Sequence, residues 1–242
     1  MQAAAETASG LDDHGGTIEL LWGLRRPATR GPKPMLSIDR IAQAAVDIAD
    51  ADGLAAVSMQ RVSDQLGVTK MALYRYVAGK AELLAIMIEQ AVSDPPDLDR
   101  VPGGWRPRLQ AWAHSMWVAW DRHPWLPGAT TGDRAMGPRE LGWVECAVGA
   151  LAGTGLSGRE QMDAVVLLSG HIRNTRSPAI AGTFPWTTER QLRLLHRYGD
   201  RFPALTAAVA TAAADAPPRD PHKAREFGLE RILDGLGMRI AE

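Results

Sequence analysis

Residues 58–80, SMQRVSDQLGVTKMALYRYVAGK, have the pattern of two short helices joined by a tight turn. Ser58 and Thr69 are typical N-cap residues, because their side-chain oxygens accept hydrogen bonds from backbone N–H groups left unpaired at a helix start. Gly67 can adopt the positive φ of a tight turn at low energetic cost. We therefore expect a first helix that ends at Gly67 and a second that begins after Thr69, which is a helix-turn-helix.

The second of these helices presents two different faces. Its apolar residues return every four or five positions, close to one helical face, and they are Val68, Leu73 and Val77. The other face carries small, basic and aromatic side chains, namely Thr69, Lys70, Met71, Ala72, Arg75 and Tyr76. A short helix with such an outer face suits the major groove of DNA, so the pattern predicts a DNA-binding helix.

The charge distribution agrees with DNA as a partner. The net charge of the chain is −1, but residues 25–80 contain nine Lys or Arg against five Asp. The near-neutral total disfavours a protein that packs DNA without sequence preference, because non-specific binding is nearly all electrostatic. Four basic residues near the N-terminus predict an arm along the DNA, in the minor groove: Arg25, Arg26, Arg30 and Lys33. A solvated, disordered tail also explains them, and the sequence leaves both interpretations open.

The remainder of the chain has helical apolar spacing broken by turn clusters. No segment shows a convincing run of period-two alternation, so we expect an all-α protein. We divide it into an N-terminal extension (1–36), a helix-turn-helix domain of three helices (37–83) and a second helical domain (84–242).

Four of the eight tryptophans fall on one stripe of the helix expected from Trp105 to His123. A bulky helical core explains this stripe. An aromatic-lined cavity for a flat apolar molecule explains it too, since ligand sites are mostly apolar with a few polar groups that fix orientation. The second interpretation predicts a site for a small hydrophobic or aromatic effector, with candidate residues Trp112, Met116, Trp120, Trp143, His171 and Asn174.

Patterns typical of catalysis or metal binding are missing from the sequence. It has no nucleophile elbow, phosphate loop or dinucleotide fingerprint, its six histidines form no H-x-x-x-H pair, and Cys146 is its only cysteine. We predict no catalytic residues, no metal and no cofactor. An all-helical enzyme with a DNA-binding-like N-terminal helical trio is the alternative.

Nothing in the sequence indicates a membrane protein. The aliphatic cluster at residues 18–24 is far shorter than the roughly 20 residues that cross a bilayer. We therefore expect a cytoplasmic protein that has no membrane partner.

Residues 38–92 resemble the N-terminal domain of the Tet-repressor (TetR) family of bacterial regulators. The resemblance rests on IAQAAVDIADADGLAAVSMQRVSDQLGVTKMALYRYVAGKAELL, with its G-V pair, its L-Y-R triplet and the K-x-x-L that starts the following helix. The upstream segment IELLWGLRRPATRGPKP resembles extensions of actinobacterial members. The resemblance implies a dimeric transcriptional repressor whose subunits each place one helix in a major groove of a palindromic double-stranded DNA operator.

The resemblance also implies roles for single residues. Five match positions that face bases or the adjacent backbone: Gln60, Thr69, Lys70, Met71 and Ala72. Three match positions that touch phosphate: Tyr74, Tyr76 and Lys80. Met71 and Ala72 offer apolar contact rather than hydrogen bonds, so they suit a thymine methyl group and read little else.

Two helices are expected to form the homodimer surface, by resemblance and by apolar pattern. One spans residues 161–175 and the other residues 227–240, and together they make a four-helix bundle between subunits. We assign residues 84–242 to ligand binding and dimerisation. From the tryptophan stripe and the continuous helical link at residues 83–92, we expect an effector in this domain to shift the linking helix and release the repressor from its operator.

Overall fold

The computed structural model describes residues 14–25, 36–175, 189–214 and 221–241 of the 242-residue chain. It divides into two compact units, Met1–Val166 and Leu167–Glu242. The described residues form helices and turns without a strand, which confirms the all-α expectation.

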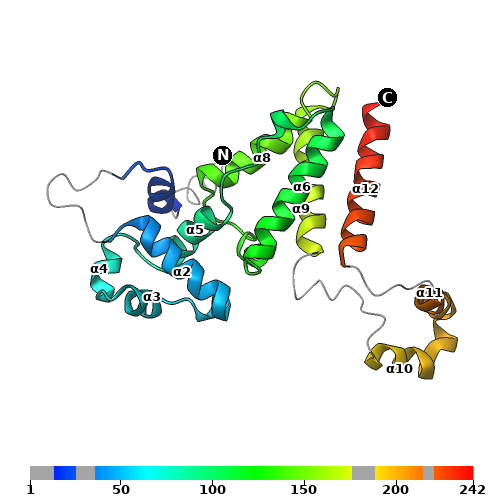
Figure 1. Ribbon diagram of the computed structural model, residues 1–242, viewed down its shortest axis with the longest axis horizontal. Helices are drawn as coiled ribbons and strands as arrows, with labels where there is room; N and C mark the ends of the chain where they lie inside the picture. The colour runs from blue at the N-terminus through cyan, green and yellow to red at the C-terminus, as the bar shows by residue number, and fades with distance from the viewer. Residues whose placement is uncertain (1–13, 26–35, 176–188, 215–220, 242) are drawn as a thin grey trace, which may run out of the picture. The chain divides into compact units, whose positions relative to one another are not determined.

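The first four helices after residue 36 form a small domain, labelled in Figure 1. They are α2 (Ile38–Asp52), α3 (Met59–Leu66), α4 (Lys70–Tyr74) and α5 (Lys80–Ala91), with a short 3-10 turn η1 (Leu54–Ala56) between α2 and α3. The Ser37 hydroxyl oxygen caps α2 by accepting from the Arg40 amide at 3.2 Å. The apolar side of α2 packs along α5 and against α3.

The helix-turn-helix has the predicted caps. The Ser58 hydroxyl oxygen accepts from the Arg61 amide at 3.2 Å, and the Thr69 hydroxyl oxygen accepts from the Ala72 amide at 3.3 Å. Gly67 has φ 66° and ψ 32°, in the left-handed region that the turn requires. The second helix ends at Tyr74, one residue before the position expected from sequence.

The first unit continues with the helices that surround the tryptophan-rich segment. They are α6 (Trp105–Arg122), the short α7 (Leu126–Ala129), α8 (Pro138–Ala150) and the first part of α9 (Gly158–Asn174), with a 3-10 turn η2 (Leu98–Arg100) before α6. Helix α6 packs against α8. A helical segment at residues 14–21 also belongs to this unit and is the blue helix beside α2 and α5 in Figure 1.

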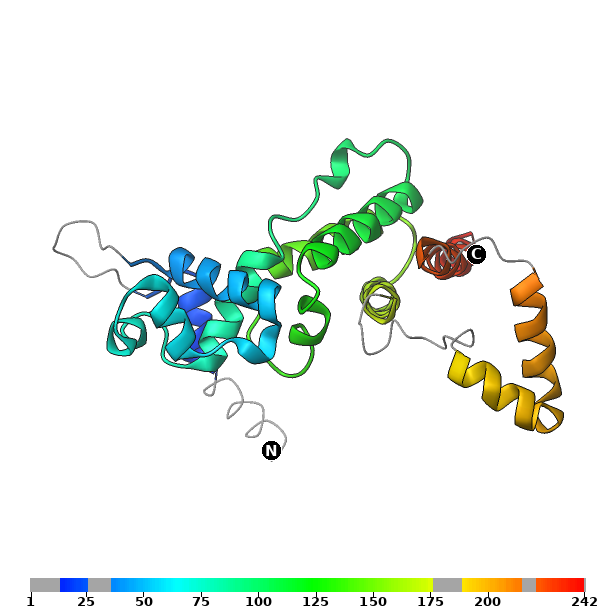
Figure 2. The ribbon, with the colours of Figure 1, turned by 60° about the horizontal axis from the view of Figure 1, so that its bottom comes forward.

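The second unit contains the last part of α9 and four further elements, shown from yellow to red in Figure 2. These are α10 (Glu189–Tyr198), η3 (Gly199–Arg201), α11 (Pro203–Ala214) and α12 (Pro221–Ile240). Helices α9 and α12 approach closely: the His171 Nε2 lies 2.9 Å from the Arg225 carbonyl oxygen. A Cβ on Gly228 would overlap the His171 ring, so a larger residue there must displace that ring.

We expect Ser58→Ala to lower the free energy of unfolding by about 1 kcal/mol, because α3 then loses the acceptor for one of its unpaired amides. Urea unfolding followed by circular dichroism measures the change. Ser58→Asp is the matched control, since its carboxylate can still cap the helix. Equal losses in both variants would contradict a capping role for Ser58.

Candidate nucleic-acid interface

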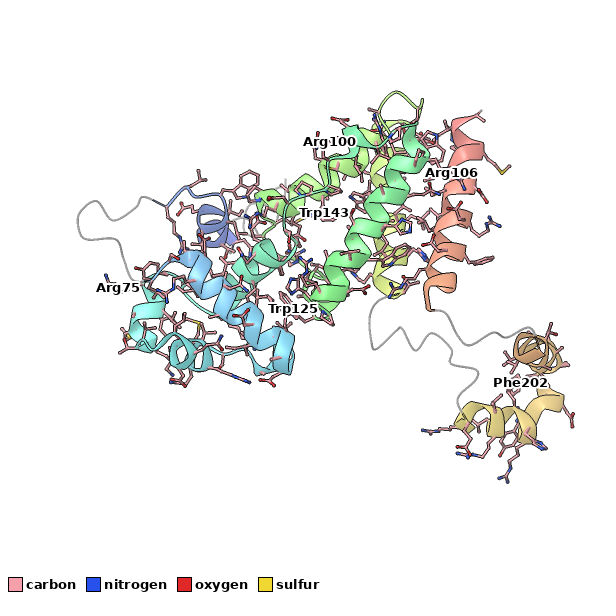
Figure 3. All side chains as sticks on the ribbon, in the orientation of Figure 1. Arg75, Arg100, Arg106, Trp125, Trp143 and Phe202 are labelled. Atoms are coloured by element: carbon pink, nitrogen blue, oxygen red, sulfur yellow. The ribbon has the colours of Figure 1, made fainter. Side chains whose placement is uncertain are left out.

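Helix α4 lies on the small domain with one side buried and the other exposed. Leu73 is fully buried, whereas the Met71 side chain is 73% exposed and Tyr74 is 45% exposed. Thr69 and Lys70 are also exposed, and Ala72 is partly covered. Figure 3 shows Arg75 projecting outward from the end of the same helix.

The other predicted DNA contacts flank α4. Gln60 on α3 is exposed, and its side-chain N–H group donates to Asp64 Oδ1 at 2.6 Å. Tyr76 is half-buried in the turn after α4, and Lys80 is exposed at the first position of α5. The chain therefore presents cations, small side chains and an exposed aromatic ring around one short helix, which suits contact with bases and phosphates.

The basic arm predicted from sequence lies only partly within the described residues. Arg25 points to the protein itself, where Nη1 donates to the Tyr76 carbonyl oxygen at 3.1 Å and Nη2 to the Gly16 carbonyl oxygen at 2.7 Å. It also pairs with the Glu82 carboxylate. Arg26, Arg30 and Lys33 lie outside the described residues.

The tryptophan stripe on α6 is buried. Trp112, Trp117 and Trp120 are each at most 5% exposed, and Met116 is partly covered. The Trp112 Nε1 donates to the Trp143 carbonyl oxygen at 2.9 Å, and the two indole rings lie 6.4 Å apart at a 60° tilt. This packing joins α6 to α8, as the core interpretation of the stripe predicts.

Trp143 also contacts the end of the linking helix. Its Nε1 donates to the Val92 carbonyl oxygen at 3.2 Å, directly after α5 ends (Figure 3). The predicted effector residues Trp112 and Trp143 thus connect α6, α8 and the C-terminal end of α5. His171 and Asn174 belong to the second unit, and their roles remain sequence predictions.

Two side-chain clusters tie the helix-turn-helix domain to the helices that follow it. On α2, the Asp50 carboxylate accepts from Trp125 Nε1 at 2.7 Å and lies 2.9 Å from His123 Nδ1. Both partners follow α6 in the chain. These long-range contacts have no signature in local spacing, and sequence reasoning missed them.

The second cluster centres on Glu89 of α5. Its carboxylate accepts from the Arg139 amide at 2.7 Å and the Glu140 amide at 3.5 Å, where α8 begins without a side-chain cap of its own. Glu89 therefore caps α8 from another helix. Burial raises the pKa of the Glu89 carboxyl, and the two backbone hydrogen bonds oppose that rise.

A pocket of about 540 Å³ opens beside Glu89. It is lined by the segment at residues 14–25 and by α2, α5 and α8, and its walls include Leu20, Leu21, Ile38, Ala42, Ile86, Glu89, Pro138 and Arg139. Sequence reasoning did not find it, because its walls come from four separate segments.

The described residues show neither a metal-binding cluster nor a membrane-spanning helix. Within the described ranges, no group of three or more His, Cys, Asp or Glu is placed to hold a metal ion. None of the described helices has both the length and the hydropathy needed to cross a membrane.

Two family models match the chain. Residues 41–87 match the model "Bacterial regulatory proteins, tetR family", and residues 96–240 match "Tetracyclin repressor-like, C-terminal domain". The helix-turn-helix falls within the first match, and α6 to α12 fall within the second.

Curated relatives and solved structures agree with these matches. The transcriptional repressor DrrR1 of Streptomyces coeruleorubidus is 34% identical over all of this chain and 92% of its own. A transcriptional repressor of Mycobacterium tuberculosis is 27% identical over 91% of this chain and 86% of its own. The Streptomyces coelicolor protein ActR in complex with actinorhodin is 24% identical, with a TM-score of 0.70 over 88% of this chain and all of its own.

We expect the half-buried Glu89 carboxyl to make folding stability fall as the pH rises. Its folded-state pKa is raised, so its contribution is fully present below the unfolded-state pKa and is lost as pH passes the folded-state value. Glu89→Gln cannot ionise and keeps an acceptor oxygen for the Arg139 amide. Urea unfolding between about pH 4 and pH 7 should therefore show a flatter profile for this variant than for wild type. Glu145→Gln, at an exposed position on α8, is the control. Parallel stability profiles for wild type and Glu89→Gln would show that Glu89 does not cause this pH dependence.

Proposed function

The chain belongs to the tetR family of bacterial regulatory proteins and is a DNA-binding transcriptional regulator, and from this we propose that it is a homodimeric repressor of a palindromic operator. A small hydrophobic or aromatic effector releases it from the DNA. The observation that carries the proposal is the match to DrrR1, a named transcriptional repressor, over the full length of this chain. Such a regulator acts where the chromosome lies, in the cytoplasm.

In this proposal α4 enters the major groove. Thr69, Lys70, Met71 and Ala72 face bases or the adjacent backbone, together with Gln60 from α3. The exposure of Lys70 and Met71 supports this, because both side chains can reach a base edge without any change in the fold. Lys70 supplies the polar contact, while Met71 suits a thymine methyl group.

Phosphate contacts fix the register of the helix on the duplex. We assign them to Tyr74, Tyr76 and Lys80. Lys80 occupies the first position of α5, where the positive end of the helix dipole also favours an anionic phosphate.

Homodimerisation is supported by exposed apolar side chains on α9 and α12. Met162, Val166 and Leu167 on α9 are between 49% and 68% exposed. On α12, Phe227 is 69% exposed and Met238 is 75% exposed; they are eleven residues apart, which is three helical turns and therefore one face. A two-fold dimer buries the same patch on both subunits, and it would place two α4 helices about 34–36 Å apart, one turn of DNA.

The effector is proposed to act through α5. Trp143 bonds to the residue after α5, and Trp112 bonds to Trp143. A ligand that enters among Trp112, Met116, Trp120 and Trp143 must rearrange these contacts and so displace the end of α5. ActR, a protein of the same fold, has been solved with actinorhodin bound. A ligand releases DNA only if it binds the DNA-incompetent state more tightly.

The operator can be found by selection. Purified protein incubated with random genomic fragments at about 0.15 M salt should enrich one inverted repeat, because a symmetric dimer reads two equivalent half-sites. Sequencing of the recovered fragments is the measurement. A folded protein that enriches no fragment would contradict the proposal.

Lys70→Ala and Lys80→Ala should weaken binding in different ways. Loss of the Lys70 base contact should cost about 1–3 kcal/mol, or roughly 5- to 150-fold in affinity, mainly on the selected fragment. Loss of the Lys80 phosphate contact should weaken binding to all sequences and lower the salt slope by about one. Fluorescence anisotropy with the selected fragment and a scrambled fragment measures both.

Arg193→Ala is the control for these two variants, because its pair with Glu189 is an exposed contact within α10. Lys70→Ala with unchanged affinity for the selected fragment would contradict the assignment of α4. An enzyme with a helix-turn-helix-like fold would keep its activity in both lysine variants.

Tryptophan fluorescence should report effector binding. A panel of hydrophobic and aromatic compounds should contain members that quench the buried indoles and also lower the affinity for the selected fragment. Trp120→Phe should weaken such binding, because the pocket loses aromatic contact area. A compound that binds and leaves DNA affinity unchanged would refute the coupling.

A further inference from the structure

The N-terminal segment of residues 14–25 packs against helices of the first unit although it lies outside the matched family regions. The tetR-family model begins at residue 41. Leu20 is only 6% exposed, and Trp22 Nε1 donates to the Met136 carbonyl oxygen at 3.2 Å. We call residues 14–25 the N-terminal strap.

Arg25 is the last residue of the strap, and its side chain contacts the turn between α4 and α5. Its guanidinium donates to the carbonyl oxygens of Tyr76 (3.1 Å) and Gly16 (2.7 Å) and pairs with the carboxylate of Glu82. The planar guanidinium presents five donors in a fixed fork, so one Arg can hold several acceptors in one geometry. Here the acceptors are Gly16 in the strap itself, Tyr76 in the α4–α5 turn and Glu82 in α5.

Glu82 explains why this contact is important. The residue is 7% exposed, and its other carboxylate oxygen accepts from the Ala78 amide at 2.7 Å. Glu82 therefore braces the α4–α5 turn from inside. A buried carboxylate is costly unless it is paired, and Arg25 supplies the opposite charge.

We infer that Arg25 is a positioning residue for operator recognition, a role that rests on the proposed function. It holds the α4–α5 turn through the Tyr76 carbonyl on one side and Glu82 on the other. Tyr76 lies in this turn and Lys80 directly follows it, so these two of the three proposed phosphate contacts are kept in a fixed relation to α4. Arg25 acts through the protein and does not touch the DNA.

The salt dependence of binding separates this role from a direct phosphate contact. Arg25→Ala should lower affinity for the selected fragment by about tenfold, as expected when a charged group loses its hydrogen bonds. The slope of log affinity against log salt should stay at the wild-type value. A phosphate contact would lower that slope by about one, for which Lys80→Ala is the reference. Arg25→Lys keeps the positive charge but lacks the planar guanidinium. Its affinity for the selected fragment should therefore lie between those of wild type and Arg25→Ala.

Hydrogen exchange tests the positioning without any DNA. The Ala78 amide should exchange faster in Arg25→Ala, because Glu82 loses the partner that orients it, while amides in α2 and α6 keep their wild-type rates. Glu82→Gln removes the buried charge and keeps an acceptor. Its effect and that of Arg25→Ala should be non-additive in the double variant. Arg193→Ala, which removes the same charge from an exposed pair on α10, should change neither exchange nor DNA affinity.

The outcomes are distinguishable. Wild-type affinity and wild-type Ala78 exchange in Arg25→Ala would overturn the inference and leave the proposed function standing. A salt slope lowered by about one with unchanged exchange would also overturn it, in favour of a phosphate contact. If wild-type protein selects no fragment, the proposed function fails. Unchanged Ala78 exchange in Arg25→Ala would then still show that Arg25 does not position the α4–α5 turn.

Discussion

The burial of α5 is the constraint on which the rest of the first unit depends. Leu83, Ile86, Met87 and Ile88 are each at most 4% exposed, and the helix packs against α2 on one side and contacts α7 and α8 on another. Burial of this kind stabilises the fold by about 25 cal/mol per Å² of apolar surface. Because both sets of neighbours share this helix, α5 cannot move without repacking at least one of them.

Two glutamates give α5 polar contacts with equally defined geometry. Glu82 and Glu89 are seven residues apart, which is two helical turns. Glu82 accepts from the Ala78 amide in the turn that leads into α5, and Glu89 accepts from the Arg139 amide of α8. A displacement of α5 relative to α8 would leave the Arg139 amide without this acceptor, at a cost of about 1–3 kcal/mol. The helix is therefore suited to discrete positions rather than gradual sliding, which is what a two-state regulator requires.

Local sequence predicted the helix-turn-helix closely, because its limits depend on short-range chemistry. The caps at Ser58 and Thr69 and the left-handed Gly67 are properties of single residues and their immediate neighbours. The one-residue difference at the end of α4 is of the size that fraying helix ends produce. The tryptophan stripe likewise predicted which face of α6 is buried, but it left core and cavity open, since both need the same apolar periodicity.

By itself, then, the sequence determined the all-helical class, through apolar periodicity along the whole chain, and it determined the helix-turn-helix and the family through caps and motifs within about 55 residues. Only the tertiary structure decided where Arg25 points, which amides Glu82 and Glu89 accept from, and how Asp50 meets Trp125. In sequence, Arg25 was one of four basic residues with two possible roles. Its partners lie 51 and 57 residues away, and no local spacing encodes a contact that exists only after α4 and α5 have packed against the strap.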